Sequence, residues 1–135
     1  MSIIKLPLHY EGSQGEKILD TLFDIGASYS CINADDVKNL AERTRLRNPK
    51  WVKTTQDGDN LEAKYAVCLD FYIGEVSLSD EFMVVLNLSE AVILGDLTMR
   101  KWHIKLDFEN NKAVVNPKVG KWQLIEIKGE RASNV

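Results

Sequence analysis

Asp24 stands at the end of an apolar segment, in the sequence Leu22-Phe23-Asp24-Ile25-Gly26, and glycine lets the chain turn directly after it. A carboxylate in apolar surroundings is unfavourable by several kcal/mol unless it is paired or hydrogen-bonded. A two-fold axis beside Asp24 would bring two such groups together, and they would then share one proton because like charges that close cannot both ionise. The ionised member could act as general base on a water while the other protonates an amide. The plainer alternative is that Asp24 only caps the turn through local backbone bonds.

The segments that must position Asp24 are mostly β-strands. Short stretches rich in β-branched and aromatic residues alternate with turn residues, among them Gly, Asn and Asp. The expected strands are residues 3–10, 16–23, 64–72, 81–86, 102–108, 113–116 and 122–127, and a further apolar strand, 92–94, enters a glycine corner. This spacing is typical of an all-β, mostly antiparallel fold, and the length predicts a single domain over residues 1–135.

One or two short helices interrupt the strands. Residues 33–43 can begin with Asn33 as N-cap, carry two aspartates in the first turn and place apolar residues on one face. A second, shorter helix is expected after Gly95, over residues 97–101.

Charge and hydropathy exclude several classes of function. With 17 Lys and Arg against 20 Asp and Glu, the net charge is −3, so we expect no nucleic-acid partner. The local exception is the basic run at residues 43–50, interpreted as a solvated helix end and loop. No segment approaches the ~20 apolar residues of a membrane span, so no membrane partner is expected either.

Cysteine and histidine give no sign of a metal or another cofactor. Cys31 and Cys68 lie in apolar segments and predict buried, reduced thiols. His9 and His103 stand far apart, without a metal-ligand motif, so no cofactor and no metal are expected. The start of the sequence has no basic leader followed by a small-residue cleavage site, and the expected location is the cytoplasm.

Three segments together resemble a known family. Asp24-Ile25-Gly26-Ala27-Ser28 resembles the Asp-Thr-Gly-Ala-Ser/Asp signature of retropepsin-like aspartic proteases. Residues 92–96, Val-Ile-Leu-Gly-Asp, resemble the family's second element, whose strand packs under the active-site loop. Residues 51–72, with Asp57-Gly58 at their centre, resemble the flap hairpin that closes over substrate. The order of the three segments matches the family, and they span most of the chain.

The resemblance implies a retropepsin-like acid protease fold with one lobe per chain. It implies a homodimer, because each chain supplies one aspartate, and an aspartic endopeptidase that hydrolyses peptide or protein substrates. The expected strand 122–127 could contribute to the dimer interface. The site residues that the resemblance implies are Asp24 as the catalytic residue and Gly26, Ala27, Ser28, Asp57 and Gly58 as substrate-binding residues.

A second function of the same fold stays open. The family has threonine or serine at position 25, where the hydroxyl bonds across the dimer beneath the aspartates, and this chain has Ile25. The alternative is therefore a catalytically inactive retropepsin-like dimer that binds peptides or proteins.

Overall fold

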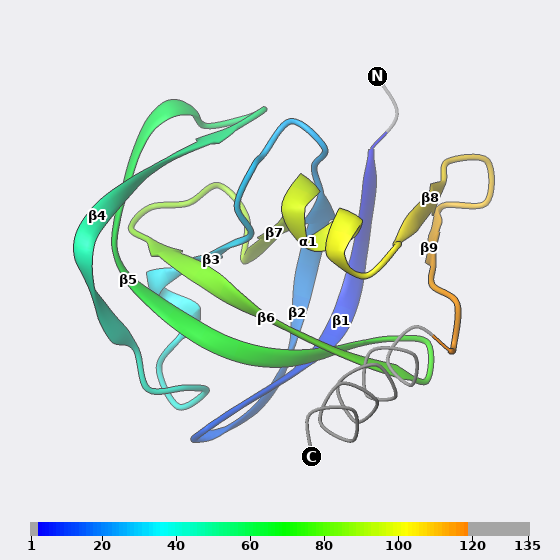
Figure 1. Cartoon of the computed structure of the whole chain (residues 1–135), viewed down its shortest axis with the longest axis horizontal. Helices are drawn as coiled ribbons and strands as arrows, with labels where there is room; N and C mark the ends of the chain where they lie inside the picture. The colour runs from blue at the N-terminus through cyan, green and yellow to red at the C-terminus, as the bar shows by residue number, and fades with distance from the viewer. Residues whose placement is uncertain (1–2, 119–135) are drawn as a thin grey trace, which may run out of the picture.

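The structure of the chain is a computed structural model that describes residues 3–118 (Figure 1). Within these residues, strands dominate, and they are joined by one 3₁₀ helix, η1, and one α-helix, α1. In chain order the elements are β1 (Ile4–Gly12), β2 (Gly15–Phe23), β3 (Cys31–Asn33), η1 (Ala34–Asp36), β4 (Thr44–Thr54), β5 (Gly58–Ile73), β6 (Val76–Val85), β7 (Val92–Leu94), α1 (Asp96–Lys101), β8 (Lys105–Asp107) and β9 (Lys112–Val114). The predicted all-β fold with short helices is confirmed.

Seven strands form one curled sheet in the order β1-β2-β7-β3-β6-β5-β4. The first strand also pairs with the fifth, Tyr10 opposite Phe71, so that the sheet closes on itself as a small barrel (Figure 1). Most pairs are antiparallel, but β2 with β7 and β3 with β6 are parallel. The last two strands, β8 and β9, form a separate small hairpin.

Alternating burial along the strands makes the core. On β1, Ile4, Leu8 and Tyr10 are buried, while Lys5 and Pro7 between them are exposed. The Tyr10 ring stacks on that of Phe71 from β5 at a centroid distance of 5.9 Å and meets that of Phe82 from β6 edge-to-face at 5.8 Å, both arrangements that aromatic pairs prefer. A second apolar cluster lies under the loop that follows Asp24, and includes Leu22, Ala27, Cys31, Val52, Met83 and Ile93.

The helices differ from expectation in length. The predicted N-cap is confirmed, because the Asn33 side chain accepts a hydrogen bond from the amide of Asp35 at 3.0 Å. The prediction of a helix over residues 33–43 is wrong beyond Asp36, because the 3₁₀ helix η1 ends there and turn residues follow it. The helix after Gly95 is confirmed as α1. Among residues 3–118, neither helix has the length and apolar character that crossing a membrane requires.

Three further expectations are wrong. The basic run at residues 43–50 is not a helix end and loop, because pairing with β5 draws it into β4. Trp102 ends α1, where its indole donates to the Ser79 carbonyl at 2.9 Å, so the strand expected over 102–108 shortens to β8. Cys31 is buried, but Cys68 is exposed, because it points away from the barrel between two inward-facing neighbours.

The expected strand 122–127 lies outside the described residues, and the single domain over 1–135 stays a prediction.

Candidate active site

Two parallel strands carry Asp24 to its place. Strand β2 ends at Phe23, which stands opposite Leu94 at the end of β7. The Asp24 amide continues this pairing by donating to the Leu94 carbonyl at 3.0 Å, and the chain then turns back, with the Ala27 amide donating to the Asp24 carbonyl at 3.1 Å. Asp24 is only 7% exposed, so its carboxylate must find partners within the protein.

Three donors satisfy the Asp24 carboxylate. The Gly26 amide donates to Oδ1 at 2.8 Å. The other two come from Thr55, whose amide donates to Oδ2 at 3.0 Å and whose hydroxyl donates to Oδ1 at 2.6 Å. Hydrogen bonds to an ionised acceptor are among the stronger ones in proteins. The carboxylate is therefore held by its own turn and covered by a segment 31 residues away along the chain.

The β4–β5 hairpin brings Thr55 to the carboxylate. Its turn comprises residues 55–57, and Gly58 follows with a φ of +83°, a conformation that favours glycine. The Asp57 amide donates to the Thr54 hydroxyl oxygen at 2.8 Å, which tightens the turn. The Ser89 hydroxyl donates to the Asp57 carboxylate at 2.6 Å, so that the loop before β7 also holds the hairpin tip.

Gly95 lets α1 pack against the loop that follows Asp24. A Cβ at this position would lie 2.6 Å from the Tyr29 carbonyl oxygen and 2.9 Å from that of Ala27, closer than backbone atoms allow. The Asp96 amide then donates to the Ala27 carbonyl at 2.7 Å, and the Leu97 amide to that of Ser28 at 3.2 Å. The glycine corner thus explains the apolar-apolar-glycine pattern of residues 93–95.

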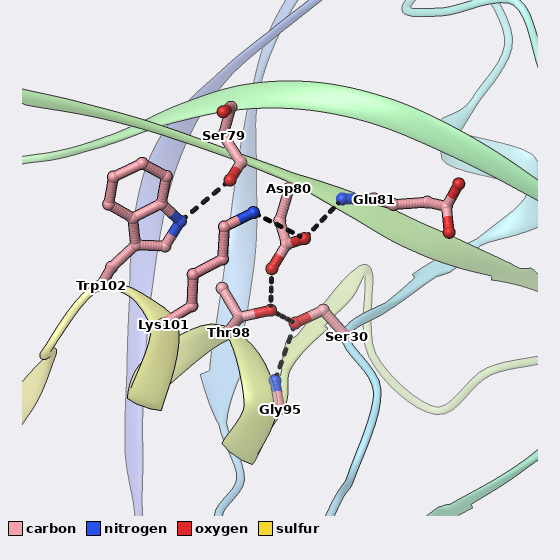
Figure 2. A network of polar contacts seen from close by, with 8 residues as sticks. All are labelled: Ser30, Ser79, Asp80, Glu81, Gly95, Thr98, Lys101 and Trp102. Carbon is pink, nitrogen blue, oxygen red and sulfur yellow. Dashed lines mark hydrogen bonds and ion pairs between the residues drawn. The ribbon is translucent and has the colours of Figure 1, made fainter. Parts of the chain in front are cut away.

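A chain of hydroxyl groups connects this corner to the barrel wall (Figure 2). The Ser30 hydroxyl oxygen accepts from the Gly95 amide at 2.9 Å, lies 2.6 Å from the Thr98 hydroxyl, and Thr98 in turn donates to Asp80 Oδ2 at 2.6 Å. Since each hydroxyl has one proton, Ser30 must donate to Thr98. We call Ser30, Thr98 and Asp80 the hydroxyl relay.

The acidic end of the hydroxyl relay is anchored on β6. Asp80 Oδ1 accepts from the Glu81 amide at 2.8 Å and lies 3.6 Å from the Lys101 ammonium (Figure 2). Both hydroxyl residues are buried, and no buried side-chain polar atom lacks a hydrogen-bond partner among the described residues. The relay therefore joins the loop after Asp24, α1 and β6 into one unit.

A cavity of about 500 Å³ opens beside the carboxylate. Apart from Asp24 and the hairpin residues Thr55 and Gln56, apolar side chains form most of its wall, and several are exposed: Ile3 by 54%, Ile25 by 69% and Phe108 by 49%. A buried carboxylate beside a largely apolar cavity is typical of a ligand-binding or active site, and the carboxylate is the one acidic group among the described residues that line it.

Solved structures share this architecture. The retroviral protease-like domain of Ddi1 from Leishmania major is 13% identical, with a TM-score of 0.62, and the match covers 86% of this chain and 90% of that one. EIAV protease complexed with the inhibitor HBY-793 is 16% identical, with a TM-score of 0.57, and the match covers 76% of this chain and 90% of that one. The chain has a retropepsin-like fold. No family model and no curated protein matches the sequence.

The retropepsin-like fold brings together only some of the residues singled out from the sequence. Asp24 and Gly26 share a hydrogen bond, Ala27 is fully buried behind them, and Ser28 is exposed. Asp57 and Gly58 lie in the hairpin turn as expected, but the carboxylate of Asp57 bonds to Ser89 and Thr54 instead of facing Asp24. The substrate-binding roles of these residues stay predictions.

Sequence reasoning missed Thr55, Thr98 and Asp80. Thr55 directly precedes Gln56-Asp57-Gly58, and nothing in the sequence indicates which residue of this segment contacts the Asp24 carboxylate. Thr98 and Asp80 meet Ser30 only through the fold, since they come from separate segments of the chain.

Side chains of metal-ligand type also meet on the β1–β2 hairpin, at the end opposite Asp24. His9, Glu11 and Glu16 place ligand atoms within 4.8 Å of one another. Other contacts account for them, because His9 lies 3.3 Å from the Glu16 carboxylate and Glu11 accepts from the Tyr72 hydroxyl at 2.5 Å.

Proposed function

We propose that the chain is a homodimeric aspartic endopeptidase in which the Asp24 residues of two copies activate a water. The observation that carries the proposal is the placement of Asp24. Its carboxylate is buried at the end of paired parallel strands, oriented by the Gly26 amide and open to a largely apolar cavity. The retropepsin-like fold supports the same conclusion, at the level of architecture.

The need for a second copy follows from the chemistry. Peptide hydrolysis by carboxyl groups needs one ionised and one protonated member, and each chain supplies one Asp24 at this site. The exposed Ile3, Ile25 and Phe108 around the cavity give a partner an apolar surface to cover. A homodimer with its axis beside Asp24 would complete the site and bury these side chains together.

The proposed reaction begins when the hairpin tip moves off the carboxylate, because Thr55 bonds to both of its oxygens. The ionised carboxyl group then removes a proton from water as the water oxygen attacks the peptide carbonyl carbon. The protonated partner gives its proton to the amide nitrogen as the carbon–nitrogen bond breaks. The products are a free carboxyl and a free amino end.

A second candidate is a catalytically inactive dimer that binds peptides or proteins. Ile25 supports it, because this position lacks the hydroxyl that the family uses to brace the dimer. The Thr55 hydroxyl also bonds to the Asp24 carboxylate and covers it, which is compatible with a site that binds peptides without cleaving them.

We further propose that the chain acts in the cytoplasm. Both cysteines are free, and free thiols persist in a reducing compartment.

Incubation with a mixed peptide library over a range of pH tests the first candidate. Wild type and Asp20→Asn, which changes an exposed carboxylate on the strand that leads to Asp24, should cleave, while Asp24→Asn should not. Activity should fall at high pH, where the pair loses its shared proton. Cleavage that survives in Asp24→Asn, or a protein that sediments only as a monomer, would refute the mechanism. Peptide binding without cleavage would favour the second candidate.

A further inference from the structure

A basic surface runs along the outermost strand of the sheet. Residues 43–53 hold five of the 17 cationic side chains of the chain and none of its 20 acidic ones. We call this set the basic edge, and its members are Arg43, Arg45, Arg47, Lys50 and Lys53. The four apart from Lys50 are exposed, and Lys50 is half-buried. The rest of the chain has 12 cationic side chains against all 20 acidic ones, so the basic edge differs in charge from its acidic surroundings.

Two arginines of the basic edge share one aromatic ring. Strand β4 stands last in the sheet order, and Arg45 lies opposite Tyr65 on β5. The Arg43 guanidinium lies 3.9 Å from the centre of the Tyr65 ring and that of Arg45 lies 5.5 Å from it. Arg45 also donates to the Tyr65 hydroxyl at 3.1 Å. Arg43 directly precedes β4 and Arg45 lies within it, and these contacts hold both guanidinium groups beside the same ring.

Among the side chains that the structure describes, at residues 3–58 and 61–118, no carboxylate forms an ion pair with any of the five side chains of the basic edge. Cations on an edge strand often only prevent unwanted strand pairing. That role needs charge alone and does not require two guanidinium groups held on one ring, where like charges repel each other. An anion bound between them would relieve the repulsion.

We propose that the basic edge is a docking surface for an acidic, extended segment of polypeptide. Alternate residues of an extended chain are roughly 6.6–6.8 Å apart, so carboxylates at every second position of the segment match the two-residue separation of Arg43 and Arg45 along the chain. A cavity of about 290 Å³ beside them is lined by Arg43, Tyr65 and the 75% exposed Leu86, and it offers room for an apolar side chain of the same segment. Glu62, which also lines the cavity, lies 3.8 Å from the Lys64 ammonium.

The position of the basic edge favours a polypeptide over a nucleic acid. The net charge of −3 would repel a long polyanion, which usually binds a basic domain. Strand β4 leads directly into Thr55 over Asp24, and the Lys50 ammonium lies 5.7 Å from the ring of Tyr29 in the loop after Asp24. If the proposed protease function holds, the acidic segment belongs to the substrate, and the basic edge selects proteins that carry acidic residues at a distance from the cleaved bond, because Arg45 lies ten residues before Thr55 along the chain.

Fluorescence anisotropy with the full chain carrying Asp24→Asn tests the docking without cleavage. The probe is a short fluorescein-labelled peptide of alternating Glu and Thr, compared with a peptide of the same composition whose glutamates are contiguous. We expect Arg43→Gln with Arg45→Gln to weaken binding of the alternating peptide about 3- to 30-fold, because each exposed ion pair contributes modestly. Lys105→Gln with Lys112→Gln, which removes the same charge from β8 and β9, should leave binding unchanged.

Tyr65→Leu provides a second test, because it removes the ring and keeps both arginines; it should also weaken binding of the alternating peptide. Equal affinity for the arginine double variant and the lysine double variant would overturn the proposal. A short single-stranded RNA that binds more tightly than the alternating peptide, and whose binding the same arginine changes abolish, would also overturn it. That result would assign the basic edge to nucleic acid. Since binding is measured in an Asp24→Asn background, failure of docking and failure of proteolysis are separate results.

Discussion

The hydroxyl of Thr55 should hold the β4–β5 hairpin closed over Asp24. Valine has the same branched shape and no hydroxyl, so Thr55→Val removes the 2.6 Å bond to Oδ1 while the amide bond to Oδ2 at 3.0 Å can remain. Thr55→Ser is the matched control, because it keeps the donor and removes only a methyl group. The hairpin of the valine variant should therefore open more often, without losing its turn.

How much more often the hairpin opens in Thr55→Val depends on the strength of a hydrogen bond to the charged Asp24 carboxylate. A hydrogen bond to a charged group contributes about 1.5–3 kcal/mol, which corresponds to a roughly 10- to 150-fold change in an equilibrium constant. Thr55 is exposed, so water can replace part of the lost bond, and we expect the lower end of this range. If substrate enters only the open form, KM should fall by about the same factor, with little change in kcat.

Amide hydrogen exchange of residues 54–58 measures this opening directly and needs no catalytic activity. Exchange should be about tenfold faster in Thr55→Val than in Thr55→Ser and wild type. Equal exchange in the two variants would show that the hydroxyl does not keep the hairpin closed. A rise of KM in Thr55→Val would mean instead that the hydroxyl binds substrate.

Three further outcomes test the surroundings of Asp24. Gly26→Ala places a Cβ 2.5 Å from the Thr55 hydroxyl, so it should displace the hairpin and accelerate the same amide exchange; unchanged exchange would contradict this. Thr98→Val interrupts the hydroxyl relay and leaves buried polar groups unpaired, so it should lower the free energy of unfolding in urea by about 1–3 kcal/mol, whereas Thr98→Ser should change it little. Burial raises the pKa of the Cys31 thiol to about 12, with the nearby Asp57 and Asp24 adding to the shift, so alkylation followed by mass spectrometry should label exposed Cys68 in the native protein and Cys31 only after unfolding.

Local patterns in the sequence predict the part of the fold that supports Asp24. The apolar segment before Asp24 and the apolar pair before Gly95 are short and continuous, as buried parallel strands require, and they become the ends of β2 and β7. The requirement for glycine at position 95 is also local in sequence, although its cause is the backbone of residues 27–29. The apolar composition of these segments is enough to predict that they are buried, and their structure can therefore be predicted from the sequence.

The remaining features depend on contacts between distant segments. The residues that become the first half of β4 are mostly polar and exposed and include a proline, so their composition gives little sign of a strand; pairing with β5 decides their structure. Thr55 reaches Asp24, and Thr98 reaches Asp80, only after the sheet has closed. Cys68 is a different case, because strict alternation with buried Val67 and Leu69 predicts an exposed side chain.

In the proposed homodimer, position 25 affects the contact between the two copies and not the way one chain holds its carboxylate. The donors to Asp24 come from Gly26 and Thr55, and the side chain of Ile25 is 69% exposed at the cavity. Under the proposed function, any effect of the missing hydroxyl therefore arises where the second copy would cover this surface. Ile25→Thr replaces an ethyl group with a hydroxyl, so it loses two buried carbon groups at about 0.8 kcal/mol each, roughly 1.6 kcal/mol on each chain, whereas a hydrogen bond across the axis contributes about 0.5–1.5 kcal/mol net.

These magnitudes predict that Ile25→Thr weakens the affinity between the two copies but improves the alignment of their Asp24 carboxylates. The variant should form a weaker dimer, because the lost apolar burial exceeds the gain from hydrogen bonding. At concentrations that keep it dimeric, it should cleave peptides faster, because bonds across the axis fix the two carboxylates in register. Sedimentation and peptide cleavage, measured together with Ile25→Val as an apolar control, separate the two effects. A threonine variant that dimerises more weakly and cleaves no faster would show that the apolar contact of isoleucine aligns the pair as well as a hydroxyl does.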